Sequence, residues 1–189
     1  MARSIVYAAR DFQSTDTLRL ARMLLGKTLV IRRGASCESH LITEVEAYDG
    51  PDDKASHASR GRTPRNAVMF GPGGNWYVYL VYGIHEMLNL VTGPEEYPAA
   101  ILIRGLESIS GPGRLTRHLG IDRRFNGLSS SPETGLHIEN RSDGNGPPSI
   151  LCSARIGVDY AGPVWSQKPY RFLIGKDQAG KGSIRARRL

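Results

Sequence analysis

Two acidic residues and a tyrosine alternate with small apolar residues along the stretch 44–48, which reads Glu-Val-Glu-Ala-Tyr. Successive side chains of a strand point to opposite faces, so Glu44, Glu46 and Tyr48 would share one face. A carboxylate beside an aromatic-lined pocket could take a proton from water and offset positive charge that develops on a sugar. Acidic residues on a strand usually face solvent, and this pattern alone favours solvent exposure.

Aromatic and aliphatic residues also alternate in the stretch 76–85, which holds three of the eight tyrosines. The alternation predicts a strand with Tyr77 and Tyr79 on one face, and Gly83 is the natural turn before an apolar run that returns as a second strand. Tyr82 would then stand at or near the tip of a β-hairpin. A tip aromatic either packs under a neighbour or contacts a partner, and spacing alone favours packing.

Several other kinds of site are not indicated. His57 and His85 lack the spacing of metal ligands, and Cys37 and Cys152 form no paired motif. The glycine-rich stretch 71–74 is not followed by the Gly-Lys-Ser/Thr of a phosphate loop, and no serine stands in a nucleophile elbow. The sequence therefore predicts no metal site and no nucleotide-binding loop, and its two unpaired cysteines fit a reducing compartment.

Composition favours one domain and a polyanionic partner. A chain of 189 residues with 40% hydrophobic residues can bury a sizeable core. Of the net charge of +7, four positive charges lie in 181–189, and removing them leaves +3. An ordinary solvated surface explains so modest an excess as well as nucleic acid does. The loop 60–66 adds a cluster of arginines, while no signal peptide or membrane-length apolar run is present.

Capping, turn and periodicity signals predict strands and helices in irregular alternation. Strands are expected at 27–32, 37–48, 76–82, 87–91 and 99–104, with candidate strands at 135–139, 154–158 and 170–174, and helices at 18–25, 54–57 and 114–119. The first helix follows the capping sequence 14–16, and Arg104 would stand at the rim of its strand. This pattern suits an α+β fold better than a doubly wound parallel sheet.

A set of stretches spread along the chain forms a pattern that no single one of them defines. They are 24–27, 44–48, 52–57, 62–70, 77–83, 87–89, 100–107, 111–115 and 154–158. In order and approximate spacing, from about residue 10 to residue 175, they resemble the alkyladenine (3-methyladenine) DNA glycosylase family. The resemblance implies a single α+β domain with a curved, mainly antiparallel β-sheet, flanking helices and a protruding β-hairpin.

The resemblance assigns roles to the residues that match the family's motifs. Glu46 would be the general base that orients and deprotonates the water attacking C1′. Tyr48, His57 and Tyr79 would form the pocket, with the rings stacking on a flipped base and His57 contacting its edge. Asn89 would line the pocket wall and disfavour the 2-amino group of guanine.

The resemblance also assigns contacts to the DNA backbone and the base stack. Tyr82 would be the wedge that fills the gap left by the extruded nucleotide, and Arg104 would lie near the catalytic water and the adjacent backbone. Arg62 and Arg65 of the basic loop would contact phosphates. Flipping a base costs a few kcal/mol, stacking on aromatic rings returns roughly 1–3 kcal/mol per base, and an inserted side chain holds the duplex open.

The function that the resemblance implies is that of a monofunctional DNA N-glycosylase of base excision repair. It would flip alkylated or deaminated purines (3-methyladenine, 7-methylguanine, hypoxanthine) out of double-stranded DNA, hydrolyse the N-glycosidic bond and leave an abasic site. No metal or organic cofactor and no membrane would be involved, and the protein would act as a monomer. Residues 1–180 would form the glycosylase domain and 181–189 a basic mobile tail. The protein would be cytoplasmic and nucleoid-associated in a prokaryote, or nuclear in a eukaryote.

Two alternatives from other classes stay open at this point. A binding module for DNA or RNA would use the basic loops and Tyr82 but would have no use for Glu46 beside a polyanion. A small-molecule hydrolase would use Glu44 and Glu46 as a carboxylate pair and would need neither the projecting tyrosine nor the basic loops.

Overall fold

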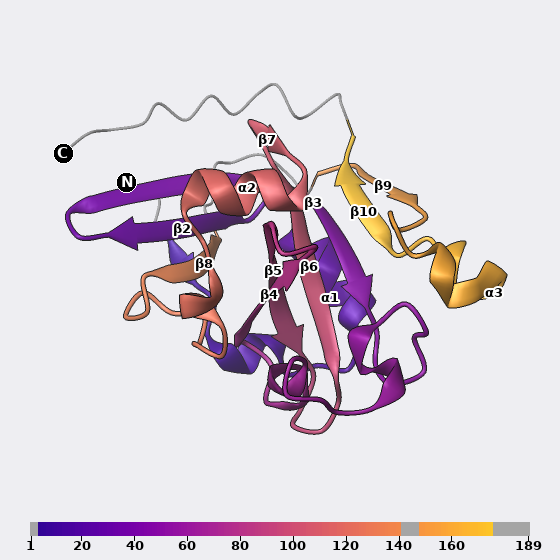
Figure 1. Cartoon of the computed structure of the whole chain (residues 1–189). Coiled ribbons are helices and arrows are strands. Elements are labelled where there is room, and N and C mark those ends of the chain that lie inside the picture. The colour runs from indigo at the N-terminus through magenta and orange to yellow at the C-terminus, as the bar shows by residue number, and fades with distance from the viewer. Residues whose placement is uncertain (1–3, 141–147, 176–189) are drawn as a thin grey trace.

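The computed structural model describes residues 4–140 and 148–175. Within these residues, ten strands form one sheet in which every pairing is antiparallel (Figure 1). The strands are β1 (Ile5–Val6), β2 (Thr28–Arg33), β3 (Ser36–Tyr48), β4 (Trp76–Val81), β5 (His85–Thr92), β6 (Ala99–Leu106), β7 (Ile109–Ser110), β8 (Leu136–Asn140), β9 (Ile150–Ser153) and β10 (Arg171–Ile174). Their order is β1-β8-β2-β3-β6-β5-β4, while β7 pairs with β6, and β10 pairs with β3 and β9. The predicted α+β class with a mainly antiparallel sheet is confirmed.

Strand β3 borders three other strands and carries the acidic stretch. Its first half pairs with β2, and its second half pairs with β6 on one side and β10 on the other. Glu46 lies opposite Leu102 of β6 and opposite Arg171 of β10. Because both edges of this half are hydrogen-bonded, the backbone that carries Glu46 lies in the interior of the sheet.

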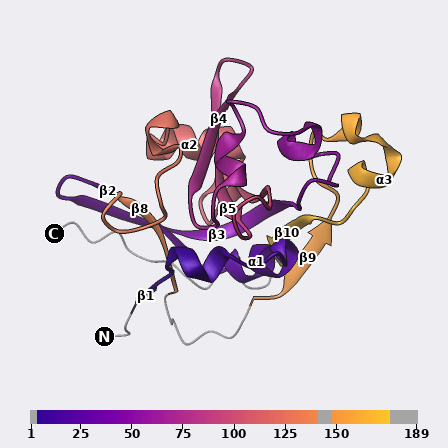
Figure 2. The same cartoon turned by 90° about the horizontal axis from the view of Figure 1, so that it is seen from below.

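Helices cover both faces of the sheet. Besides the α-helices α1 (Thr17–Leu24), α2 (Pro112–Leu119) and α3 (Gly162–Ser166), short 3₁₀ helices span Ala9–Phe12, His57–Arg60, Ala67–Phe70, Arg123–Phe125 and Asp159–Ala161. In Figure 2, α1 lies below the sheet and α2 above it. Leu20 and Leu24 of α1, with Leu115 and Leu119 of α2, are fully buried in the main hydrophobic core. The Asp16 side chain starts α1 by accepting a hydrogen bond from the Arg19 N–H at 2.9 Å.

The tyrosine stretch forms the predicted hairpin of β4 and β5. Val81 pairs with His85, so the tip consists of the three residues between them. Tyr82 and Gly83 at the tip adopt left-handed backbone conformations, with φ of 53° and 69°. The side chain of Tyr82 is 91% exposed, so the packing interpretation that spacing favoured for this residue is wrong.

Three local predictions differ from the structure. The short helix expected at 54–57 is the 3₁₀ helix His57–Arg60, which the Ser56 hydroxyl caps by accepting a hydrogen bond from the Ala58 N–H. No strand forms at 154–158; β9 ends just before it, and the Ile156 N–H donates to the Glu46 side chain rather than to a strand backbone. Arg104 is not at the rim of its strand, since β6 continues to Leu106 and the Arg104 side chain is only 12% exposed.

The expected tail at 181–189 lies outside the described residues. Among the residues that are described, no helix is long and apolar enough to cross a membrane.

Candidate active site

An aromatic pocket opens between the 3₁₀ helix His57–Arg60, the strands β3 to β6 and the 3₁₀ helix Asp159–Ala161. Its lining is Tyr48, Ala55, Ser56, His57, Met69, Tyr77, Tyr79, Asn89, Ala100 and Tyr160. The structure thus brings together Tyr48, His57, Tyr79 and Asn89, which the sequence predicted as one pocket. Tyr77, which the alternation assigned to the same face as Tyr79, is buried in the core and also lines the pocket.

One side of the pocket is a packed cluster of rings. The centroids of His57 and Tyr79 lie 4.6 Å apart with an interplanar angle of 71°, and those of Tyr77 and Tyr79 lie 5.0 Å apart at 31°. His57 Nδ1 is 3.1 Å from the hydroxyl of Tyr77. Burial, with the charge of Arg65 nearby, lowers the pKa of His57, so its imidazole is neutral at pH 7. Burial raises the pKa of Tyr77 to about 12, so its hydroxyl keeps its proton.

Asn89 holds its place through its amide nitrogen. Nδ2 donates hydrogen bonds to the carbonyl oxygens of Tyr77, at 3.0 Å, and Met87, at 3.2 Å. Asn89 lies opposite Tyr77 in the register of β4 and β5 and is 3% exposed. These two bonds fix the orientation of the amide at the pocket wall.

Glu46 lies behind Tyr48 and is fully buried, so the solvent-exposed interpretation of the acidic face is wrong. Its Oε2 accepts a hydrogen bond from the Tyr48 hydroxyl at 2.9 Å. Its Oε1 accepts one from the backbone N–H of Ile156 at 2.8 Å and lies 3.4 Å from Arg104 Nε. Glu46 is not itself part of the pocket lining; its carboxylate is joined to that lining through the hydrogen bond from Tyr48.

The environment of Glu46 acts in two directions. Burial raises the pKa of the Glu46 carboxyl, whereas Arg104, the Ile156 N–H and the Tyr48 hydroxyl each act to lower it. The carboxylate also raises the pKa of Tyr48, although burial is the larger cause. Such a carboxyl combines higher basicity with donors ready to stabilise its ionised form, which is what a general base needs.

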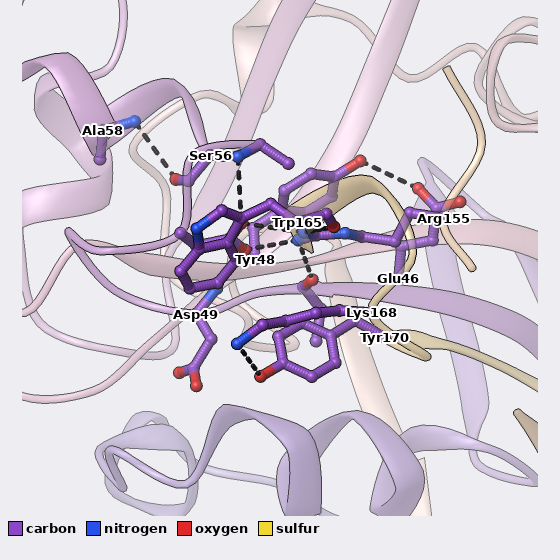
Figure 3. A network of polar contacts seen from close by, with 12 residues as sticks. Glu46, Tyr48, Asp49, Ser56, Ala58, Arg155, Trp165, Lys168 and Tyr170 are labelled. Atoms are coloured by element: carbon purple, nitrogen blue, oxygen red, sulfur yellow. Dashed lines mark hydrogen bonds and ion pairs between the residues drawn. The ribbon is translucent and has the colours of Figure 1, made fainter. Parts of the chain in front are cut away.

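Arg155 is a residue of the site to which the sequence gave no role. It forms a fully buried ion pair with Asp53, and its Nη1 donates to the carbonyl of Ala47 at 2.9 Å. Its guanidinium lies 4.8 Å from the ring centroid of Tyr48 and 5.2 Å from that of Tyr170 (Figure 3). Arg155 therefore fixes the ring of Tyr48. The only signal in the sequence was its place in the stretch 154–158.

Tyr160 is a second residue that the sequence did not reveal. It lines the pocket, and its hydroxyl donates a hydrogen bond to the carbonyl of Ala55 at 2.8 Å. Tyr160 is 64% exposed, so it belongs to the rim of the pocket rather than to its floor. A single tyrosine in a three-residue 3₁₀ helix carries no periodic signal by which it could have been found.

The two arginines of the basic loop have different partners. Arg65 donates to the carbonyl of Leu80 at 2.9 Å, and its guanidinium lies 5.2 Å from the ring centroid of Tyr79, so it braces both the hairpin and the pocket. Arg62 is exposed, pairs with Glu96 and lies over the ring of Phe70 at 4.6 Å. A phosphate at Arg62 would therefore compete with Glu96.

No group of three or more His, Cys, Asp or Glu side chains in the described part of the chain is placed to hold a metal ion. The ionisable and polar side chains at and next to the pocket are a carboxylate, tyrosines, a neutral histidine and guanidinium groups.

Comparison with known proteins gives a consistent result. The family model described as "Methylpurine-DNA glycosylase (MPG)" matches residues 11–110 and 107–178. A relative from Anaeromyxobacter sp. (strain Fw109-5) is 44% identical over 175 residues, covering 88% of each chain. One from Methanocella arvoryzae is 44% identical over 183 residues, covering 86% of this chain and 90% of its own. One from Bacillus cereus (strain G9842) is 39% identical over 194 residues, covering 87% and 94%.

All three relatives carry the name "Putative 3-methyladenine DNA glycosylase". Both the family match and the extent of these relatives cover nearly all of the chain's described elements. The resemblance that the sequence motifs indicated is thus confirmed. The chain belongs to the methylpurine-DNA glycosylase family and is a DNA glycosylase, a hydrolase of N-glycosyl bonds that acts in base excision repair.

Proposed function

We propose that this DNA glycosylase flips alkylated or deaminated purines out of duplex DNA and hydrolyses their N-glycosidic bond with a water activated by Glu46. The observation that carries the proposal is the buried Glu46 carboxylate, hydrogen-bonded at 2.9 Å to Tyr48 at the wall of an aromatic pocket. The enzyme would act as a monomer, use one water per turnover and leave an abasic site. With no amine nucleophile assigned, it would not cleave the strand.

The pocket suits a flat ring that carries positive charge. Tyr48 and Tyr79 offer π faces, on which a flipped purine would gain roughly 1–3 kcal/mol from stacking. Electron-rich faces attract cations, so 3-methyladenine and 7-methylguanine would bind better than neutral adenine or guanine. The neutral imidazole of His57 can donate or accept one hydrogen bond at the base edge without repelling a cation.

Glu46 would serve the hydrolysis step itself. As the bond from C1′ to the base nitrogen breaks, its electron pair leaves with the base and positive charge develops on the sugar. The ionised Glu46 would stabilise that charge and take a proton from the water whose oxygen bonds to C1′. An alkylated purine is already cationic and needs no proton to leave. Hypoxanthine is neutral, so its release requires an acid that we do not assign.

Tyr82 would provide the wedge, and its exposure at the hairpin tip supports that role. A ring inserted between base steps fills the space that the flipped nucleotide leaves. A glycosidase that uses Glu44 and Glu46 as a pair is not favoured, because Glu44 is already held by Arg104 and Arg171.

The test is base release from duplex oligonucleotides that carry 7-methylguanine or hypoxanthine, detected as alkali-labile abasic sites. We expect release by the wild type and a loss of about 100-fold or more in the single-turnover rate for E46Q, since general-base catalysis contributes about 10²–10⁴-fold. The matched control is E38Q, which alters a partly exposed glutamate of the same strand and should release base at the wild-type rate. Full release by E46Q, or none by the wild type, would contradict the proposal.

A further inference from the structure

Glu44 is a buried acidic residue to which the reaction proposed above gives no task. It stands two residues before Glu46 on β3 and is 8% exposed. A buried carboxylate is costly unless it is paired and hydrogen-bonded. Its partners therefore indicate what it does.

Glu44 and Glu46 share one arginine. Arg104 Nε lies 3.0 Å from Glu44 Oε1 and 3.4 Å from Glu46 Oε1, so a single N–H group stands between the two carboxylates. The same oxygen of Glu44 accepts a second hydrogen bond, at 2.7 Å, from Arg171 Nε. In the described part of the chain, the terminal nitrogens of Arg104 have no hydrogen-bond partner.

The backbone makes room for Glu44 in particular. The register between β3 and β6 shifts on both sides of Glu44, as in a β-bulge. Opposite it stands Gly105, where an added Cβ would lie 2.9 Å from the Glu44 Cβ and 3.3 Å from its Oε2. A side chain at position 105 would thus push the Glu44 carboxylate out of its place.

We propose that Glu44 is a positioning residue that holds Arg104 against Glu46 and leaves the terminal nitrogens of Arg104 available to the substrate, while Arg171 balances the charge of Glu44. This inference rests on the proposed role of Glu46 as the base. Holding Nε between two carboxylates fixes the plane of the guanidinium, because its donors form a rigid fork. The fork then presents its remaining N–H groups in one direction, toward a phosphate or the attacking water.

The same residues also determine the electrostatic environment of the Glu46 carboxylate. The groups that face it are Arg104 from β6, Arg171 opposite it on β10, Glu44 and Tyr48 from its own strand, and the Ile156 N–H. Arg155, Tyr79 and Tyr160 lie close enough to interact electrostatically. Arg104 lowers the pKa of Glu46 and Glu44 raises it. Removing the charge of Glu44 should therefore lower this pKa. Removing Arg171 should raise it, because Glu44 then lacks its second counter-charge.

The experiment is a pH profile of the single-turnover rate of 7-methylguanine release, corrected for enzyme-free depurination. This base is cationic before it leaves and needs no acid, so the acidic limb of the profile reports the ionisation of Glu46 together with that of His57. The variants of Glu44 and Arg171 leave His57 unchanged, so a difference between their limbs is assigned to Glu46. We expect the limb of E44Q to move to lower pH and that of R171Q to move to higher pH. The acidic limb of the E44Q/R171Q double variant should lie between the limbs of the two single variants. E38Q should superpose on the wild type.

The positioning of Arg104 by Glu44 is tested separately with E44A, which removes both hydrogen bonds to the Glu44 carboxylate. We expect its plateau rate to fall on the order of tenfold or more, as misplaced catalytic groups do, with E44Q retaining more of the rate because its amide oxygen can still accept from Arg104. If E44A does not fold, the opposite shifts of E44Q and R171Q decide the question.

Shifts in the same direction, or profiles that superpose while E46Q is inactive, would overturn the role of Glu44 and leave the proposed function standing. An active E46Q, or a wild type that releases no base at any pH, would instead overturn the proposed function.

Discussion

Tyr48 and Tyr82 are tyrosines at opposite extremes of constraint. Tyr48 donates its hydroxyl to Glu46 at 2.9 Å, and the guanidinium of Arg155 lies 4.8 Å from its ring centroid. Tyr82 is 91% exposed, stands in a left-handed backbone conformation and has no hydrogen-bond or ring partner among the described residues. One aromatic is fixed within the fold, whereas the other is held by no contact that the described residues make.

This difference in constraint matches the roles proposed for the two residues, since Tyr48 belongs to the pocket wall and Tyr82 to the hairpin tip. In the proposed reaction the pocket holds a purine in one orientation, and its walls are set by contacts that also contribute to the stability of the fold. A non-glycine residue in the left-handed region costs of order 1–3 kcal/mol, and exposure of a large aromatic gives nothing back in the free protein. A mutation in the pocket wall should therefore affect stability and chemistry together, and one at the hairpin tip should affect chemistry alone.

The largest effect on this comparison is expected from R155M. It leaves Asp53 buried without its counter-charge, which should cost about 3–5 kcal/mol of unfolding free energy. Denaturant unfolding measures this loss, and base release should fall because the ring of Tyr48 loses its support. The R155M/D53N double variant removes the unpaired charge and should recover part of the stability. A single variant as stable as the wild type would show that Arg155 does not brace the pocket.

Y82S tests the other side of the comparison. Its unfolding free energy should stay within about 0.5 kcal/mol of the wild type, as for most surface substitutions. Its rate of base release should fall on the order of 10- to 100-fold, the equivalent of one lost stacking contact. Y82F keeps the ring and should regain most of that rate. A large drop in thermal stability for Y82S would place Tyr82 in the fold rather than at the interface.

The smallest expected effect is on the pH dependence of stability, and it concerns Glu46 beside the pocket. Burial raises the folded pKa of Glu46 above its unfolded value, so its contribution to stability is present below the unfolded pKa and is lost as pH rises through the folded pKa. E46Q does not ionise and lacks this loss. Thermal unfolding should therefore show E46Q gaining stability relative to the wild type as the pH rises through that window. A constant difference at all pH values would mean that the pKa of Glu46 is the same in the folded and the unfolded protein.

The hairpin was predictable from local sequence, whereas the burial of Glu46 and its hydrogen-bond partners were not. Alternation and Gly83 define β4, its turn and the position of Tyr82, because a hairpin is made by neighbours in sequence. Alternation assigned Glu46 to a face but could not say what covers that face. Its covering comes from Arg104 on β6 and from the N–H of Ile156, which lies 110 residues away.

The residues that hold the pocket wall in place could not be predicted from local sequence either. The pairing of Arg155 with Asp53 spans 102 residues, and no periodic pattern connects two such distant positions. The family motifs assigned Tyr48, His57, Tyr79 and Asn89 to one base pocket, and these four residues line one cavity in the structure; their roles toward a base stay predictions. The motifs gave no role to Arg155, Glu44 or Tyr160, whose tasks become visible only when the side-chain contacts are known.

The pairing of β3 on both edges has a consequence for motion. The strand that carries Glu46 can open only if β6 and β10 separate from it, so its amide protons should exchange with solvent close to the rate set by global unfolding. The amides of the hairpin tip need no such opening and should exchange within the ordinary fluctuations of a surface turn. The proposed general base, Glu46, would thus lie on a strand that opens rarely, whereas the proposed DNA contact, Tyr82, would lie on a turn that opens often.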